Sequence, residues 1–201
     1  MVKPPLLCSE YTFVLRPNWQ LMEQAYNDFK RDRHPDYGIC PRISRRAGPG
    51  REGNNCAVRL SVALWRAGSI SLDYFGGPFD HRWNQGRERR VHRGACGLEA
   101  PHVPGAQELA RHIRAVWGTG CEVFRPPGRA ATALRGRRGI IFFRNCFSRA
   151  TDDEGERNGD HIDLWDGAEF WNVKLGKSAG GGTAADAPLF GLSDEVWFFP
   201  L

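Results

Sequence analysis

Apolar residues recur along the chain at spacings that predict both helices and strands. Residues 18–30 indicate an amphipathic helix with Leu21, Tyr26 and Phe29 toward a core. A second helix is predicted directly after the polar run 51–55, because apolar residues follow at spacings of three and four. The positions that form this face are Ala57, Val58, Leu60, Val62, Leu64 and Trp65.

A third helix and three strands complete the pattern. The helix runs from 105 to 117, with Leu109, Ile113 and either Val116 or Trp117 inward, and 118–120 ends it. The compact apolar run 139–143 predicts a central strand, and residues 161–165 alternate with period two. Asp166 and Gly167 then indicate a hairpin turn, and 196–199 predicts a final strand that closes the sheet.

Cys56 stands at the predicted start of the second helix, where Asn54 or Asn55 would serve as N-cap. The positive end of the helix dipole favours a thiolate there, which suits a nucleophile. The backbone N–H of Cys56 would then bind the oxyanion that forms when the thiolate attacks a carbonyl. The alternative is that Cys56 is a small buried hydrophobe, and this segment alone favours that alternative.

His161 supplies the base that such a cysteine needs. With Asp166 and Gly167 as a two-residue turn, His161 lies opposite Asn172, whose amide would orient the imidazole. Asp163 shares the face of His161 and is the second candidate for that role. His81, beside Asp80, is the best alternative base.

Five segments, in this order, resemble the type VI secretion amidase effector family 4. They are the helix 19–29, the run Asn-Asn-Cys-Ala-Val-Arg-Leu-Ser-Val-Ala-Leu at 54–64, Gly-Ile-Ile-Phe-Phe at 139–143, His-Ile-Asp-Leu-Trp-Asp-Gly at 161–167 and Val-Trp-Phe-Phe-Pro at 196–200. The resemblance implies an α+β, papain-like NlpC-type cysteine peptidase whose nucleophile helix packs on a central antiparallel β-sheet. It also implies cleavage of peptidoglycan stem peptides between D-glutamate and meso-diaminopimelate.

The catalytic residues that the resemblance implies are Cys56 and His161. The third residue of the family is an aspartate after the turn, and an ungapped match places Asn172 there, which departs from the family pattern. The resemblance further implies a cognate immunity protein, a component of the secretion apparatus as partner, delivery to the periplasm of a target bacterium, and no cofactor.

Length and composition fit one domain over residues 1–201, with loops at about 31–55, 149–159 and 176–188. The sequence contains no apolar run long enough for a membrane span and no signal-peptide core near Met1. We therefore expect no membrane insertion and no general export, which fits an injected effector and a cytoplasmic protein equally. The six cysteines lack the paired spacings of a zinc site, and a free Cys56 would leave at most two disulfides.

The formal net charge of +5 is concentrated in the arginine runs 87–93 and 135–138. Attraction to an anionic cell wall and phosphate contacts to nucleic acid are two interpretations, and a solvated arginine-rich face is the third and favoured one. No nucleic-acid motif accompanies these runs, so no nucleic-acid partner is expected. Besides the enzyme, a basic nucleic-acid binder and a catalytically weakened peptide-binding module of the same fold remain alternatives.

Overall fold

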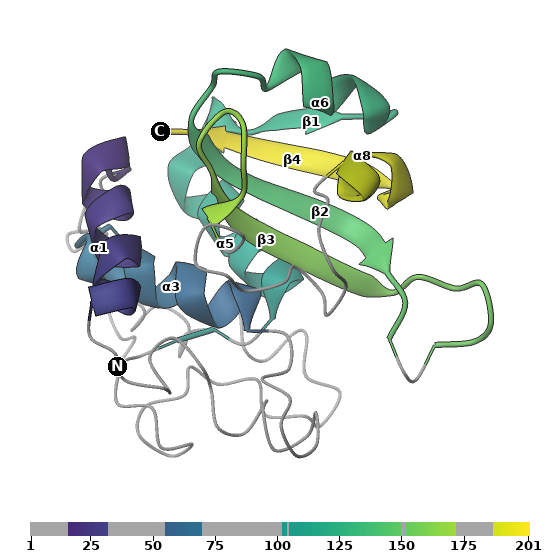
Figure 1. Ribbon diagram of the computed structural model, residues 1–201, viewed down its shortest axis with the longest axis horizontal. Helices are drawn as coiled ribbons and strands as arrows, with labels where there is room; N and C mark the ends of the chain where they lie inside the picture. The colour runs from purple at the N-terminus through teal and green to yellow at the C-terminus, as the bar shows by residue number, and fades with distance from the viewer. Residues whose placement is uncertain (1–15, 32–54, 70–101, 104, 150–151, 172–186) are drawn as a thin grey trace, which may run out of the picture.

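A computed structural model describes residues 16–31, 55–69, 102–103, 105–149, 152–171 and 187–201 of the chain. The helices are α1 (Trp19–Arg31), α3 (Cys56–Arg66), α5 (Ala106–Trp117), the 3₁₀ turn η2 (Gly118–Gly120), α6 (Gly128–Ala133) and α8 (Ala187–Leu192). The strands are β1 (Glu122–Phe124), β2 (Gly139–Phe147), β3 (Gly159–Trp165) and β4 (Glu195–Pro200). Figure 1 shows the strands side by side with helices around them.

The four strands form one antiparallel sheet in the order β1-β4-β2-β3. The predicted central strand is confirmed, because β2 pairs with β4 on one side and with β3 on the other. The final strand β4 also lies inside the sheet and does not close it at an edge. The edges are β1 and β3, and the strand that carries His161 pairs with β2 and, at Trp165, makes an isolated bridge to Phe170.

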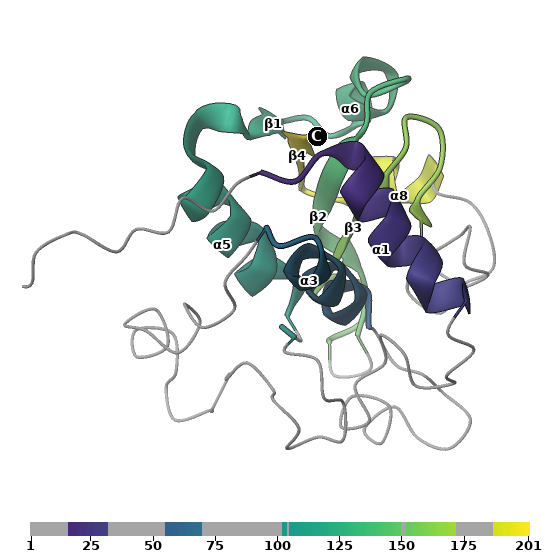
Figure 2. The ribbon, with the colours of Figure 1, turned by 90° about the vertical axis from the view of Figure 1, so that its left-hand side faces the viewer.

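Each face of the sheet is covered by its own hydrophobic core. Ile140 and Phe142 of β2 pack into the core with α1, α3 and α5, whereas Ile141 and Phe143 pack into the core with α6 and α8. Figure 2 shows α3 and α5 on one side of the sheet and α8 on the other. Because both faces are buried, β2 has an unbroken apolar run where a half-exposed strand would alternate.

The predicted second helix is confirmed as α3, and it begins at Cys56 with Asn55 as N-cap. The side chain of Asn55 makes no capping hydrogen bond, so that part of the capping prediction is wrong. The predicted apolar face is buried, with one exception. Trp65 is 43% exposed, whereas Leu64 beside it is fully buried, so the last turn of α3 directs Leu64 toward the core and Trp65 away from it.

The first predicted helix is confirmed as α1, but its inward face differs from the prediction. Tyr26 is fully buried as expected, whereas Leu21 is 45% exposed. Trp19, Met22 and Tyr26 recur at spacings of three and four and form the buried face, which turns Leu21 toward solvent. The side chain of Phe29 lies outside the described residues.

The predicted helix 105–117 corresponds to α5, whose Leu109 and Ile113 are fully buried. Trp117 is partly buried and packs against the same core. Gly118 ends the helix with a positive φ of 67°, which is a conformation that glycine adopts without a side-chain penalty.

The turn after β3 is wider than the sequence pattern predicts. Trp165 pairs with Phe170, so four residues separate the paired positions and the predicted two-residue turn is wrong. The carboxylate of Asp166 explains the difference, because its Oδ1 accepts hydrogen bonds from the backbone N–H groups of Ala168 and Glu169 at 2.8 and 2.7 Å. Such side-chain capping stabilises a longer turn.

Within the loop expected at 149–159, the described residues are in neither a helix nor a strand until β3 begins at Gly159. The loops at 31–55 and 176–188 lie almost wholly outside the described residues, and α8 begins within the second. Among the described helices, none is long and apolar enough to cross a membrane.

Candidate active site

Cys56 is the first residue of α3, and its sulfur forms no disulfide within the described chain. The helix continues directly from it, since the backbone N–H of Arg59 donates to the carbonyl oxygen of Asn55 at 3.0 Å. The Cys56 residue is 4% exposed and belongs to the core that α1, α3 and α5 share. The sulfur therefore stands at the positive end of a helix dipole with little water around it.

His161 and Asp163 share one face of β3, as predicted. Nε2 of His161 lies 3.6 Å from Oδ2 of Asp163, and both side chains are buried. Across the sheet His161 pairs with Phe143, and the two ring centroids are 6.4 Å apart. Phe170 of the following hairpin packs edge-on against the imidazole at 6.2 Å, so rings hold it on two sides.

The pKa of His161 indicates that its imidazole lies close to Cys56. Burial by itself lowers the pKa of His161, but the negative charges of the Cys56 thiolate and of Asp163 outweigh burial and raise it to about 10. The raised pKa favours the protonated imidazole, whose charged neighbours are Cys56 of α3 and Asp163 of β3.

Two further residues at this cluster were missed by the sequence interpretation. Tyr26 of α1 is fully buried, and its pKa is raised by burial, by Asp163 and by Cys56, against the opposing influence of Arg59. Arg59 lies one turn after Cys56 on α3 and is 6% exposed. The signal that would have found Arg59 is a charged residue directly between the apolar residues Val58 and Leu60 of the predicted helix.

A second thiol lies near the cluster. Cys146 of β2 is 1% exposed, and its Sγ donates to the carbonyl oxygen of Phe143 at 3.8 Å. Burial raises its pKa above the ordinary range for a thiol, and the charge of Cys56 adds to the effect. Because this pKa favours the neutral form, Cys146 is not placed to compete with Cys56 as a thiolate.

Asn172, the first candidate for orienting His161, lies outside the described residues. The register that placed it opposite His161 is wrong, because the pairing of Trp165 with Phe170 shifts the predicted partner by two positions. Of the two candidates, Asp163 is the one that the described structure brings to the imidazole.

The remaining sequence candidates are His81 and the two arginine runs. His81 and the arginine run 87–93 lie outside the described residues. In the run 135–138, Arg137 forms an ion pair with Glu122, and Arg138 lies over the ring of Trp19 at 5.2 Å. Among the described residues, no group of three or more His, Cys, Asp and Glu side chains is placed to hold a metal ion.

A thiolate at a helix N-terminus, a protonated imidazole beside it and a carboxylate behind the imidazole are suited to acyl transfer. The thiolate would attack a carbonyl carbon, and the imidazolium would protonate the leaving group. A buried site also excludes water from the charged pair until substrate enters.

Comparison with known proteins gives one family and one fold. Residues 53–199 match the family model described as type VI secretion system amidase effector protein 4. A comparison with curated proteins finds no match. The solved structures that match cover nearly the whole chain at low identity.

The Tae4/Tai4 effector–immunity system of Salmonella typhimurium, in a selenomethionine variant, has 16% identity and a TM-score of 0.57, covering 93% of this chain and 99% of that one. The Tae4–Tai4 effector–immunity complex of Enterobacter cloacae has 14% identity and a TM-score of 0.56, covering 93% and 99%. The effector Tae4 of Enterobacter cloacae alone has 14% identity and a TM-score of 0.56, covering 93% and 98%. At these identities the likeness establishes the fold, which is the predicted α+β, papain-like one.

Proposed function

The chain belongs to the family of type VI secretion system amidase effector protein 4, and from that premise we propose that it is an antibacterial peptidoglycan amidase whose nucleophile is Cys56. The observation that supports the proposal is a buried His161 whose Nε2 lies 3.6 Å from Oδ2 of Asp163 and whose pKa is raised by Cys56, the first residue of α3, and by Asp163. The bond that the family resemblance implies is the one between D-glutamate and meso-diaminopimelate in the stem peptide.

The first half of the reaction forms a thioester. The Cys56 thiolate attacks the carbonyl carbon of the scissile amide, and the electron pair of the carbonyl moves onto its oxygen. Backbone N–H groups in the first turn of α3 stabilise that oxyanion, starting with the N–H of Cys56. When the intermediate collapses, the amine leaves with the proton of the His161 imidazolium.

The second half restores the site. His161, now neutral, takes a proton from water as the oxygen attacks the thioester carbon. Collapse of that intermediate releases the carboxylic acid and returns Cys56 to its thiolate form beside a protonated His161. Because Nε2 of His161 faces Asp163, Nδ1 is the nitrogen that transfers the proton. Asp163 keeps the ring in this orientation, and no cofactor takes part.

The same proposal includes the partners of the family. Solved relatives are complexes of Tae4 with the immunity protein Tai4, and we expect a cognate immunity protein that covers the Cys56 site of this chain. Delivery would depend on a component of the secretion apparatus and would lead to the periplasm of the target bacterium, where the substrate lies.

The test is digestion of purified peptidoglycan, with the muropeptides read by mass spectrometry. The parent should release fragments cut between D-glutamate and meso-diaminopimelate, and Cys56→Ala should release none above background. Cys121→Ala is the matched control, since Cys121 is also a free cysteine and follows η2 directly before β1. Full activity of Cys56→Ala would reject the mechanism, and a folded but inactive parent would favour the peptide-binding module.

A further inference from the structure

Strand β2 contains a bulge directly beside His161. Pairing with β3 is regular from Gly139 to Phe143, which faces His161, and resumes where Phe147 faces Gly159. Three residues of β2, Arg144 to Cys146, therefore stand opposite the single residue Asp160. A bulge of this kind bends the strand and changes the direction of neighbouring side chains, and bulges are frequent next to active sites.

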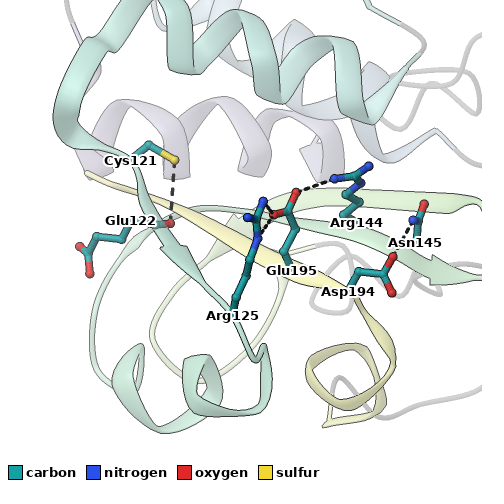
Figure 3. Close-up of polar contacts among 7 residues, drawn as sticks. All are labelled: Cys121, Glu122, Arg125, Arg144, Asn145, Asp194 and Glu195. Atoms are coloured by element: carbon teal, nitrogen blue, oxygen red, sulfur yellow. Dashed lines mark hydrogen bonds and ion pairs between the residues drawn. The ribbon is translucent and has the colours of Figure 1, made fainter.

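Asn145 is at the centre of the bulge and has a left-handed backbone, with φ at 51°. Its backbone N–H donates to Oδ1 of Asp160 at 2.9 Å, and its side-chain Nδ2 donates to Oδ2 of Asp194 at 2.7 Å. Figure 3 shows the Asn145 amide directed at Asp194, which precedes β4. Asparagine is among the few residues besides glycine that adopt this conformation at low cost.

The bulge is also attached to β4 on its other side. The backbone N–H of Asp194 donates to the carbonyl oxygen of Arg144 at 3.0 Å. The guanidinium of Arg144 lies 3.1 Å from Oε1 of Glu195, whose carboxylate is 2% exposed and also pairs with Arg125. Figure 3 shows the Glu195 carboxylate between Arg125 and Arg144. The bulge is thus held between β3 and β4 by carboxylates on both sides.

The central and the last residue of the bulge are each bonded to a neighbour of the base. Asp160 directly precedes His161 in β3, and its carboxylate accepts the bond from the backbone N–H of Asn145, which ties the bulge to the residue next to the base. Cys146, the last residue of the bulge, folds back onto the carbonyl oxygen of Phe143, the cross-strand partner of His161. The position of the imidazole therefore depends on the shape of the bulge.

We propose that Asn145 is a positioning residue for the amidase reaction: its left-handed backbone, bonded to Asp160 and Asp194, sets the bulge that holds His161 against Cys56. The inference rests on the proposed function, in which His161 transfers the proton. Asn145 does not itself touch the reacting atoms.

Two substitutions separate the backbone conformation from the side chain. Asn145→Gly keeps access to the left-handed conformation, whereas Asn145→Ala disfavours it, and both remove the bond to Asp194. Asn158→Ala is the matched control, since Asn158 is exposed and its Nδ2 donates to Glu156 in the loop before β3. Circular dichroism of each variant gives the folded fraction.

The first readout is turnover of a soluble muropeptide. We expect kcat of Asn145→Ala to fall by at least about tenfold with KM nearly unchanged, because small displacements of a catalytic group reduce rate more than binding. Asn145→Gly should stay within about threefold of the parent, since its backbone remains free to adopt the bulge. Asn158→Ala should match the parent.

The second readout does not require hydrolysis. The rate at which iodoacetamide alkylates Cys56, followed by peptide mass spectrometry against pH, reports the coupling of Cys56 to His161. The charged and titratable groups at this pair are Asp163, Tyr26, Arg59 and Cys146, and none of them is altered in the variants. The profile of Asn145→Ala should shift from that of the parent, and the profile of Asn145→Gly should not.

The proposal is overturned if Asn145→Ala keeps the parent kcat and alkylation profile, if both Asn145 variants are equally impaired, or if lost folded protein accounts for the whole effect. Failure of the proposed function looks different. In that case the parent itself lacks cysteine-dependent hydrolysis, while the alkylation profiles still show whether Asn145 positions His161.

Discussion

Oδ2 of Asp163 lies 3.6 Å from Nε2 of His161, on the same face of β3 and shielded from solvent. The neighbouring backbone N–H of Leu164 donates to Oδ1 of the same carboxylate at 2.8 Å, which restrains it. An acceptor fixed in this way keeps one nitrogen of the ring occupied and directs the other toward the nucleophile.

Replacing Asp163 by Ala should therefore lower kcat by about 100-fold or more, because the imidazole loses both its orientation and a stabilising charge. Asn172→Ala is the direct comparison. Steady-state rates on a soluble muropeptide measure both. A larger loss in Asn172→Ala than in Asp163→Ala would make Asn172 the orienting residue, in spite of the hairpin register.

The free energy of unfolding should depend on pH through the protonation of His161. Its pKa is raised from 6.5 to about 10 on folding, so the folded chain binds the proton more tightly than the unfolded chain. The stabilisation is complete below pH 6.5 and is lost as pH rises through about 10.

Urea midpoints measured between pH 6 and pH 10.5 should fall more steeply for the parent than for His161→Gln, which has no such proton to lose. Near the lower end of this pH range, the titration of His161 should no longer change the urea midpoint of the parent. Parallel curves throughout the series would contradict the raised pKa.

The two glutamates paired with arginines in the sheet should differ in their contribution to stability. Glu195 is 2% exposed and pairs with Arg125 and Arg144, whereas Glu122 is 43% exposed and pairs with Arg137. Glu195→Gln should lower the free energy of unfolding by about 1.5–3 kcal/mol, because buried charge-assisted bonds are lost. Glu122→Gln should cost less than about 1 kcal/mol, since water screens an exposed pair.

Chemical denaturation at pH 7 and at 0.1 and 1 M salt tests this difference. The effect of Glu195→Gln should persist at high salt, whereas the smaller effect of Glu122→Gln should shrink. Equal costs for the two substitutions would mean that burial does not decide the strength of these pairs.

Local patterns in the sequence were sufficient to predict the elements that carry the site. The apolar residues of the helix that begins at Cys56 and of the strand 139–143 have spacings that fit few other structures. The shared face of His161 and Asp163 follows from the two-residue period of a strand. Leu21 shows the limit of such patterns, because which face of α1 meets the core depends on what packs there.

The features that were missed depend on contacts between distant segments. The turn after β3 is wide because the Asp166 side chain accepts hydrogen bonds from two backbone N–H groups. The sequence pair Asp166-Gly167 is equally typical of a tight two-residue turn, so it did not predict this width. The bulge at Asn145 requires Asp160 and Asp194, which become its partners only when three strands assemble. The second core, which lies between the sheet and α6 and α8, likewise could not be predicted from any single segment.

Cys56 and His161 are more than a hundred residues apart in the sequence, and they meet because β3 occupies the edge of the sheet next to α3. The site is thus built from contacts of high sequence separation, which form late and slowly in folding. A chain still emerging from the ribosome has the thiol long before it has the base. In the proposed mechanism, hydrolytic activity would then arise only after β3 has been synthesised and has packed beside α3.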